Sequence, residues 1–292
     1  NIKIIKLFSL LRPHDKIKNY ILYNTMLDYF AANIFLQLTN APAIMLIVCL
    51  GIHSKHRDVF VHAFSFMAFN MILGRMLKMA FQIPLPSSLG IDDYAFPSGH
   101  MLSAATLYGY IAFAYGHRHI QTACMIILSN IGLALMYFNY HNLYDVSAAL
   151  CIAFTLIPLY YYAAQKHFIR TLTILILLGI SMVLLMPHGQ ISYTKVQHIW
   201  LNLGLLIGIY HAQSLLPHNI KATSPYPLLV IHSLFGGIWY YVGLQIHSSI
   251  LPHPCILTLT GYAFTLWVST SHKRTTINQL LQQIQRPITL LL

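Results

Sequence analysis

Glutamate is absent from this sequence, and only 8% of its 292 residues are charged. A soluble domain carries about 25% charged residues, so the composition excludes an ordinary water-soluble enzyme. Apolar residues make up 57% of the chain, and the mean hydropathy is +0.62. The sequence therefore predicts an all-α protein, a polytopic bundle of transmembrane helices.

Cysteine is also scarce, and its spacing matches neither a zinc site nor a disulfide framework. The four cysteines lie far apart, each in or at the end of an apolar stretch: Cys49, Cys124, Cys151 and Cys255. We expect them to be small buried apolar residues. No small-residue cleavage motif follows an apolar run near the start, so we expect no signal peptide.

Long apolar runs organise the chain, because a stretch of about 20 apolar residues can span a bilayer. Nine stretches qualify approximately: 36–53, 59–77, 98–116, 120–139, 143–163, 170–187, 197–215, 226–244 and 252–270. Residues 1–35 mix lysines with apolar residues and predict an amphipathic, interfacial segment. Asn40 and Pro42 are expected to break or kink the first stretch, and residues 273–292 form a tail.

The net charge of +11 would suit a nucleic-acid partner, but the basic residues lie in short loops between the apolar stretches. This distribution is the positive-inside pattern, and it favours anionic lipid headgroups as neighbours instead. The side with most lysine and arginine, which includes the tail, is expected to be cytoplasmic. The basic N-terminus then falls on the outer side, a conflict that a missed helix or a re-entrant segment before residue 53 would remove. The loops 78–97 and 139–143 share the non-cytoplasmic side, so their side chains can converge.

The first polar motif is Pro97-Ser98-Gly99-His100, at the start of an apolar stretch. Proline suits the first turn of a helix, where no backbone donor is needed. Ser98 and Gly99 then present N–H groups at the positive end of the helix dipole, which predicts an anion site. His100 points to the same place and can exchange a proton near neutral pH.

The second motif is "HNLYD", from His141 to Asp145. On a helix these two residues share a face. An aspartate bonded to one ring nitrogen leaves the other nitrogen free to attack. Lys78, at the start of the outer loop, adds a compact cation for phosphate. Together these groups predict phosphoryl transfer through a phosphohistidine, with Asp92 and Asp93 turned to water because they would repel a phosphate.

These residues resemble the motifs of the type 2 phosphatidic acid phosphatase superfamily, which run K-x6-R-P, then P-S-G-H, then S-R-x5-H-x3-D. The corresponding segments here are "KMAFQIPLP" at 78–86, "PSGH" at 97–100 and "ALMYFNYHNLYD" at 134–145. The resemblance covers residues 36–165 and implies a six-helix-type catalytic core. Residues 166–272 would then be additional transmembrane helices, similar to the extended half of some bacterial members.

The resemblance also implies a role for each matching position. His141 would be the nucleophile, Asp145 would orient it, and His100 would protonate the leaving group. Lys78, Ser98 and the backbone at Gly99 would hold the phosphate oxygens. No cofactor and no metal would be required. The partners would be membrane lipids, either phospholipid or polyprenyl phosphate, at the periplasmic face of a bacterial inner membrane.

The sequence departs from the family at both motif arginines, which are Leu85 and Leu135 here. Bidentate phosphate recognition is lost with them, although Arg75, one turn before Lys78, could supply a cation. Three functions therefore stay open. One is a lipid phosphate phosphatase, one is a headgroup phosphotransferase similar to sphingomyelin synthases, and one is a lipid-binding pseudoenzyme.

Two rivals belong to other functional classes. A haem protein would use His62, His211 or His232 as axial ligands, but no paired spacing supports it, and these histidines are expected to be hydrogen-bonded interior residues. A transporter would explain Asp28, Arg75 and Lys78 near membrane depth, but the hydropathy shows no inverted repeat.

Overall fold

The computed structural model describes residues 28–52, 54–185 and 193–215. The predicted stretches 226–244 and 252–270, the tail, and most of the N-terminal segment lie outside these residues. Within them the chain is all-α, as the composition predicts, and the only β-pairing is an isolated bridge between Pro84 and Tyr94.

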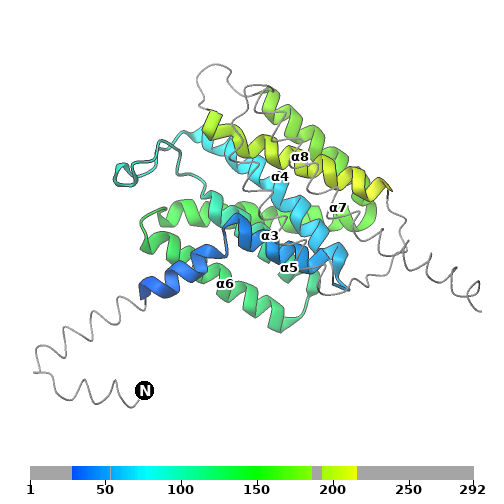
Figure 1. The fold of residues 1–292 in the computed structure, drawn as a ribbon, viewed down its shortest axis with the longest axis horizontal. Coiled ribbons are helices and arrows are strands. Elements are labelled where there is room, and N and C mark those ends of the chain that lie inside the picture. Colours follow the sequence, from blue (N-terminus) through cyan, green and yellow to red (C-terminus); the bar gives the residue numbers. More distant parts are fainter. Residues whose placement is uncertain (1–27, 53, 186–192, 216–292) are drawn as a thin grey trace, which may run out of the picture.

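The helices form a bundle (Figure 1). After a first helix, Asp28–Gln37, the elements are α3 (Ala41–Ile52), α4 (Arg57–Phe81), the 3-10 turn η1 (Ser87–Leu89), α5 (Gly99–Tyr115), α6 (Arg118–Tyr137), α7 (Leu143–Leu184) and α8 (Tyr193–Leu215). Among the described helices, α4, α6 and α7 are each long and apolar enough to cross a membrane. Asp28–Gln37 and α3 form a bent pair, which adds a fourth span if the two helices cross the membrane together.

That bent pair agrees with the predicted break at residues 40–42. Asp28–Gln37 and Ala41–Ile52 meet at an angle of 56°. The freed carbonyl of Leu38 accepts a hydrogen bond from the hydroxyl of Tyr108, at 2.9 Å. A side chain of α5 thus satisfies backbone that the break leaves without a helical partner.

α7 joins two of the predicted stretches, 143–163 and 170–187. Its 42 residues would extend about 60 Å if straight, twice the hydrocarbon thickness of a bilayer. His167 interrupts it with φ −150° and ψ 68°, a non-helical conformation. The two predicted stretches therefore meet at a kink between them rather than at a loop.

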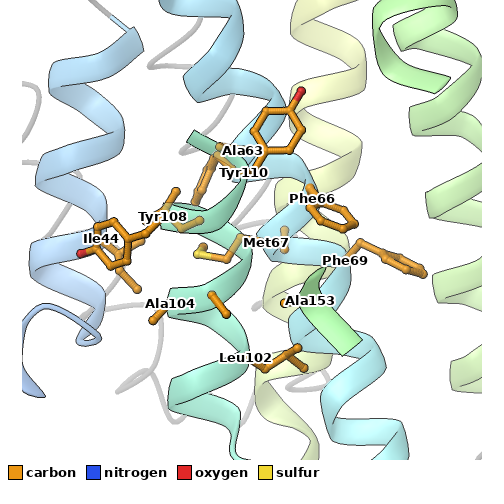
Figure 2. Close-up of a cluster of buried hydrophobic side chains, with 14 of the residues drawn as sticks. Ile44, Ala63, Phe66, Met67, Phe69, Leu102, Ala104, Tyr108, Tyr110 and Ala153 are labelled. Atoms are coloured by element: carbon orange, nitrogen blue, oxygen red, sulfur yellow. The ribbon is translucent and has the colours of Figure 1, made fainter. Parts of the chain in front are cut away.

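α5 is the central helix of the core, with α4, α6 and α7 packed against it. Figure 2 shows its residues Leu102, Ala104, Tyr108 and Tyr110 surrounded by side chains of the neighbouring helices. Small residues allow the close approach, as in other membrane helix pairs. A Cβ atom added at Gly109 would lie only 2.9 Å from Ile157 Cδ1. This packing fixes the start of α5, where the candidate site lies.

Candidate active site

Lys78 lies in the last turn of α4 and is almost fully buried. Its Nζ donates a hydrogen bond to the carbonyl of Tyr94. The loop after α4 folds back on itself to reach this position, with Leu85 N bonded to Asp93 O at 3.0 Å and Ala95 N bonded to Ile83 O at 2.7 Å. The loop thus returns the chain to the end of α4 before α5 begins.

The PSGH segment begins α5 two residues later than the sequence predicts. The first helical residue is Gly99, and Ser98, not Pro97, occupies the terminus as N-cap. The Ser98 hydroxyl oxygen accepts a hydrogen bond from Met101 N at 3.3 Å. Pro97 therefore precedes the helix and does not form its first turn, because the serine side chain takes over the capping of the terminal N–H groups.

Ser98 also connects the two motifs. Its backbone N–H donates to the carbonyl of Asp145 at 3.1 Å, so the start of α5 is bonded directly to the start of α7. The side chain is fully buried, and Ser98 is not among the residues that line the cavity described below. Its backbone N–H and its hydroxyl oxygen thus both have protein partners, and its role in phosphate binding stays a prediction.

His141 and Asp145 meet as predicted, but through a different local structure. His141 precedes α7, so the two residues do not share a face of one helix. Asn142 is the N-cap, and a capping box joins it to Asp145: Asp145 N donates to Asn142 Oδ1 at 2.9 Å, and Asn142 N donates to Asp145 Oδ2 at 3.1 Å. The same Oδ2 atom lies 3.4 Å from Nδ1 of His141. The box fixes the carboxylate, and the carboxylate in turn orients the imidazole.

The backbone of Leu135 holds His141 from the other side. Its carbonyl accepts hydrogen bonds from the N–H groups of Tyr140 and His141, at 3.0 and 3.3 Å. The Leu135 side chain is fully buried in the apolar core. This position, an arginine in the family motif, keeps a backbone role here and contributes no charge.

A cavity of about 470 Å³ opens among α4, α5, the loop before α7, and α8. Four of the predicted site residues line it: Lys78, Gly99, His100 and His141. A Cβ atom added at Gly99 would lie 3.9 Å from Cε of Lys78, so the backbone of the PSGH segment and this cation share one wall. Asp145 lies behind His141 and is buried.

The cavity also contains an ion pair that the sequence did not predict. Nη1 of Arg75 lies 2.6 Å from Oδ1 of Asp93, and both residues line the cavity. The expectation that Asp93 points to water is therefore wrong, because the folded-back loop turns it towards α4, whereas Asp92 is exposed. Burial alone would raise the pKa of Asp93, but the hydrogen bond and charge of Arg75 lower it below its ordinary value.

The charges around the cavity therefore balance. Two basic residues, Lys78 and Arg75, accompany two acidic ones, Asp93 and Asp145. Arg75 could replace one of the missing motif arginines by its position, but its guanidinium is already paired with Asp93. A dianionic phosphate thus meets less positive charge here than two free arginines and a lysine would supply.

Two cavity residues outside the sequence motifs each have a buried polar atom without a hydrogen-bond partner among the described residues. Asn70, on α4, is fully buried and its Oδ1 atom has no hydrogen-bond partner among the described residues. His198, on α8, has a buried Nδ1 atom that likewise has no hydrogen-bond partner among the described residues. Asn70 lies two turns before Lys78 on the same helix, so helical periodicity from Lys78 is the one signal that points to it.

The environment of His141 favours its neutral form. Burial and the positive charge of Lys78 lower the pKa of His141 to about 4, with Asp145 acting in the opposite direction and His100 adding to the decrease. A neutral imidazole whose Nδ1 faces a carboxylate presents its other nitrogen as a nucleophile. The surroundings of His141 thus favour an uncharged imidazole well below neutral pH.

Replacing Lys78 by methionine is expected to raise the pKa of His141 towards its ordinary value, because one of the charges that lower it is removed. If His141 is the nucleophile, its protonation then stops the reaction at a higher pH, so the acidic limb of the pH profile of kcat/KM should move up by about one pH unit. Lys166→Met is the matched control, since Lys166 is exposed and does not line the cavity. An unchanged acidic limb in Lys78→Met would show that Lys78 does not act on His141.

The fold and this cavity define a helical integral membrane protein with a histidine-based candidate active site. A family model for the PAP2 superfamily matches residues 60–169, the segment that contains all three motifs. The match confirms the family resemblance, and together with the apolar helices it indicates a membrane protein of the phosphatase type. No curated protein and no solved structure matches the chain.

Proposed function

We propose that this protein cleaves a phosphoester bond of a membrane lipid by transferring the phosphoryl group to His141. The observation that carries the proposal is the meeting of Lys78, Gly99, His100 and His141 at one cavity, with Asp145 behind His141. These residues come from three separate segments of the chain. A purely structural requirement would not gather two histidines, a lysine and a helix N-terminus around one solvent-accessible space.

The reaction would proceed in two displacements. Nε2 of His141 attacks phosphorus, the bond from phosphorus to the ester oxygen breaks, and His100 gives its proton to the leaving oxygen. Asp145 stabilises the positive imidazole that results. Water then attacks phosphorus, the bond from phosphorus to nitrogen breaks, and His100 takes the proton from that water. The products are the free lipid alcohol and phosphate, and both histidines return to their initial states.

Phosphate binding in this mechanism rests on few groups. Lys78 and the first N–H groups of α5 would hold the non-bridging oxygens. Gly99 leaves the helix N-terminus open to the phosphate because it has no side chain. We place the substrate at the non-cytoplasmic face, where the loop after α4 and the loop before α7 would meet, and we assign the catalytic core to residues 36–165.

The charge balance of the cavity favours a second candidate, headgroup transfer. A phosphodiester carries one negative charge where a monoester carries up to two, so it requires fewer cations. With Arg75 paired to Asp93 and leucines at positions 85 and 135, the site suits the less charged substrate. The acceptor would then be a lipid hydroxyl in place of water. It would attack a phosphohistidine at His141 whose phosphorus still carries the headgroup.

One assay distinguishes the two. The purified protein in detergent is given phosphatidic acid, phosphatidylglycerophosphate, a polyprenyl diphosphate, or a phosphodiester lipid with diacylglycerol or ceramide, in oxygen-labelled water. Hydrolysis predicts free phosphate that contains one labelled oxygen, and headgroup transfer predicts a new phospholipid with little free phosphate. The absence of any product with all substrates would favour a lipid-binding pseudoenzyme.

A further inference from the structure

The two basic residues of the cavity come from one side of α4. Arg75 and Lys78 are three residues apart on this helix, so their side chains project from neighbouring positions. Both line the cavity. If both charges were available, a phosphate with two negative charges would meet two positive ones at this wall.

The loop after α4 provides an oxygen atom for each of these cations, from adjacent residues. Nζ of Lys78 donates a hydrogen bond to the backbone carbonyl of Tyr94, and Nη1 of Arg75 lies 2.6 Å from Oδ1 of Asp93. A carbonyl oxygen carries no net charge, so the positive charge of Lys78 remains available to an anion in the cavity. A carboxylate carries a full negative charge, so Asp93 cancels the charge of Arg75.

The fold of the loop holds the carboxylate of Asp93 in place. Its Oδ1 atom also accepts a hydrogen bond from the N–H of Tyr94 at 2.8 Å. The backbone carbonyl of Asp93 accepts one from Leu85 N at 3.0 Å, and Tyr94 pairs with Pro84 in the isolated bridge. A rotation of the carboxylate away from Arg75 would break both contacts of Oδ1, so Asp93 is expected to stay beside the cavity when an anion enters.

A ligand in the cavity lies within the electrostatic reach of this carboxylate. The side chains of Arg75 and Asp93 are 11% and 23% exposed, and both line the cavity. The interaction energy between a fixed charge and a ligand is proportional to the charge of the ligand. Asp93 therefore repels a phosphomonoester with two negative charges about twice as strongly, in free energy, as a phosphodiester with one.

We propose that Asp93 is a specificity-determining residue that makes this cavity select lipid phosphodiesters, whose phosphate carries one negative charge, over phosphomonoesters. The proposal deepens the function proposed above and rests on it, because it requires that the phosphate of a lipid occupies this cavity. Asp93 acts by an unfavourable contact with the wrong substrate, which is a general means of discrimination. It also cancels the charge of Arg75, which by its position could replace a missing motif arginine.

Asp93→Asn tests the proposal with two lipids that share one diacylglycerol. Phosphatidic acid is a monoester with nearly two negative charges at about pH 8, and phosphatidylmethanol is a diester with one. Binding is measured in detergent on the full-length protein that also carries His141→Ala, so that turnover does not interfere. Asparagine keeps an acceptor oxygen for Arg75 and Tyr94 but removes the charge. The dissociation constant should fall about tenfold for phosphatidic acid and only about threefold for phosphatidylmethanol, because the free-energy change is halved with the charge.

Asp92→Asn is the matched control, since Asp92 is exposed and does not line the cavity. It removes the same charge from the adjacent position and should change neither dissociation constant by more than about twofold. Asp93→Ser also removes the charge, while its hydroxyl can still accept from the N–H of Tyr94, and it should give the same order of effects on the two lipids. Arg75→Gln combined with Asp93→Asn leaves the net charge unchanged, so both dissociation constants should return to within about threefold of their starting values.

The outcomes separate this proposal from the proposed function. Equal gains for the two lipids, or the same gains with Asp92→Asn, would overturn the role of Asp93. If the wild-type protein forms no product from any substrate but the larger gain for phosphatidic acid persists, the proposed reaction fails and the role of Asp93 stands. If product forms and the two lipids respond equally to Asp93→Asn, the role of Asp93 fails alone.

Discussion

His141→Ala is expected to abolish turnover, with kcat reduced on the order of 10⁴-fold or more. The reason is that, among the described residues that line the cavity, His141 alone combines a neutral imidazole with a carboxylate at its Nδ1. Alanine removes the atom to which the phosphoryl group would be transferred, and no neighbouring group in the described cavity has the same geometry. The measurement is product formation with the preferred lipid substrate in detergent.

His100→Ala should behave differently, and the contrast tests the assignment of roles. A lipid alcohol is a poor leaving group and needs the proton from His100, so turnover of the natural ester should also be lost. An aryl phosphate releases a stable phenolate without that proton, so the first displacement should survive. Phosphohistidine should then accumulate on His100→Ala, because no base activates the water of the second step.

The accumulated species can be identified as protein-bound phosphate that is labile to acid and stable to alkali. His119→Ala, at an exposed position outside the cavity, is the control and should behave as wild type. Turnover of the aryl phosphate by His141→Ala would exclude His141 as the nucleophile. Absence of the phosphorylated species in His100→Ala, with its first step intact, would favour direct attack by water.

The sequence predicts the larger features of this structure well. Hydropathy alone predicts α4, α5 and α6 to within a few residues, because each is a continuous apolar run between charged or glycine-containing ends. The motif spacing identifies Lys78, His100 and His141, which the structure brings to one cavity although 63 residues separate the first from the last. Ionisable residues next to long apolar stretches can be identified from the sequence without any knowledge of the fold.

The details that decide the chemistry are not visible in the same way. The His141–Asp145 contact depends on a capping box at Asn142, a local hydrogen-bond choice that helical periodicity does not describe. Asp93 turns inward because the loop after α4 folds back and Arg75 donates a hydrogen bond to its carboxylate. This is a tertiary contact between residues 18 positions apart. His198 reaches the cavity only because α8 packs on α4, and no local pattern encodes that neighbour.

The two missing motif arginines illustrate the same limit. In sequence Leu85 and Leu135 are equivalent losses of a cation, but in the structure they occupy different environments. Leu85 is half-buried and lines the cavity, whereas Leu135 is fully buried in the apolar core. An arginine at position 85 can point its guanidinium into the cavity, and an arginine at position 135 would have to leave its present packing to do so.

Leu135→Arg is therefore expected to destabilise the protein by about 3–5 kcal/mol, the cost of an unpaired charge in an apolar interior. The measurement is thermal unfolding in detergent, followed by size-exclusion chromatography of the heated sample. A variant as stable as wild type would mean that position 135 can open to the cavity, contrary to its full burial. The two arginines therefore cannot be introduced together, because an arginine at position 135 would destabilise the fold on which an arginine at position 85 depends.

Leu85→Arg should fold normally and lower KM for a lipid phosphomonoester about tenfold, because a guanidinium adds a bidentate, charge-assisted contact to a cavity whose charges now balance. Leu89→Arg is the matched control, since Leu89 lies on the same loop and also lines the cavity but does not occupy the motif position. A gain confined to position 85 would show that lack of positive charge limits monoester binding. No gain at either position would mean that the site is already complete for a less charged substrate, and headgroup transfer would become the better account of this cavity.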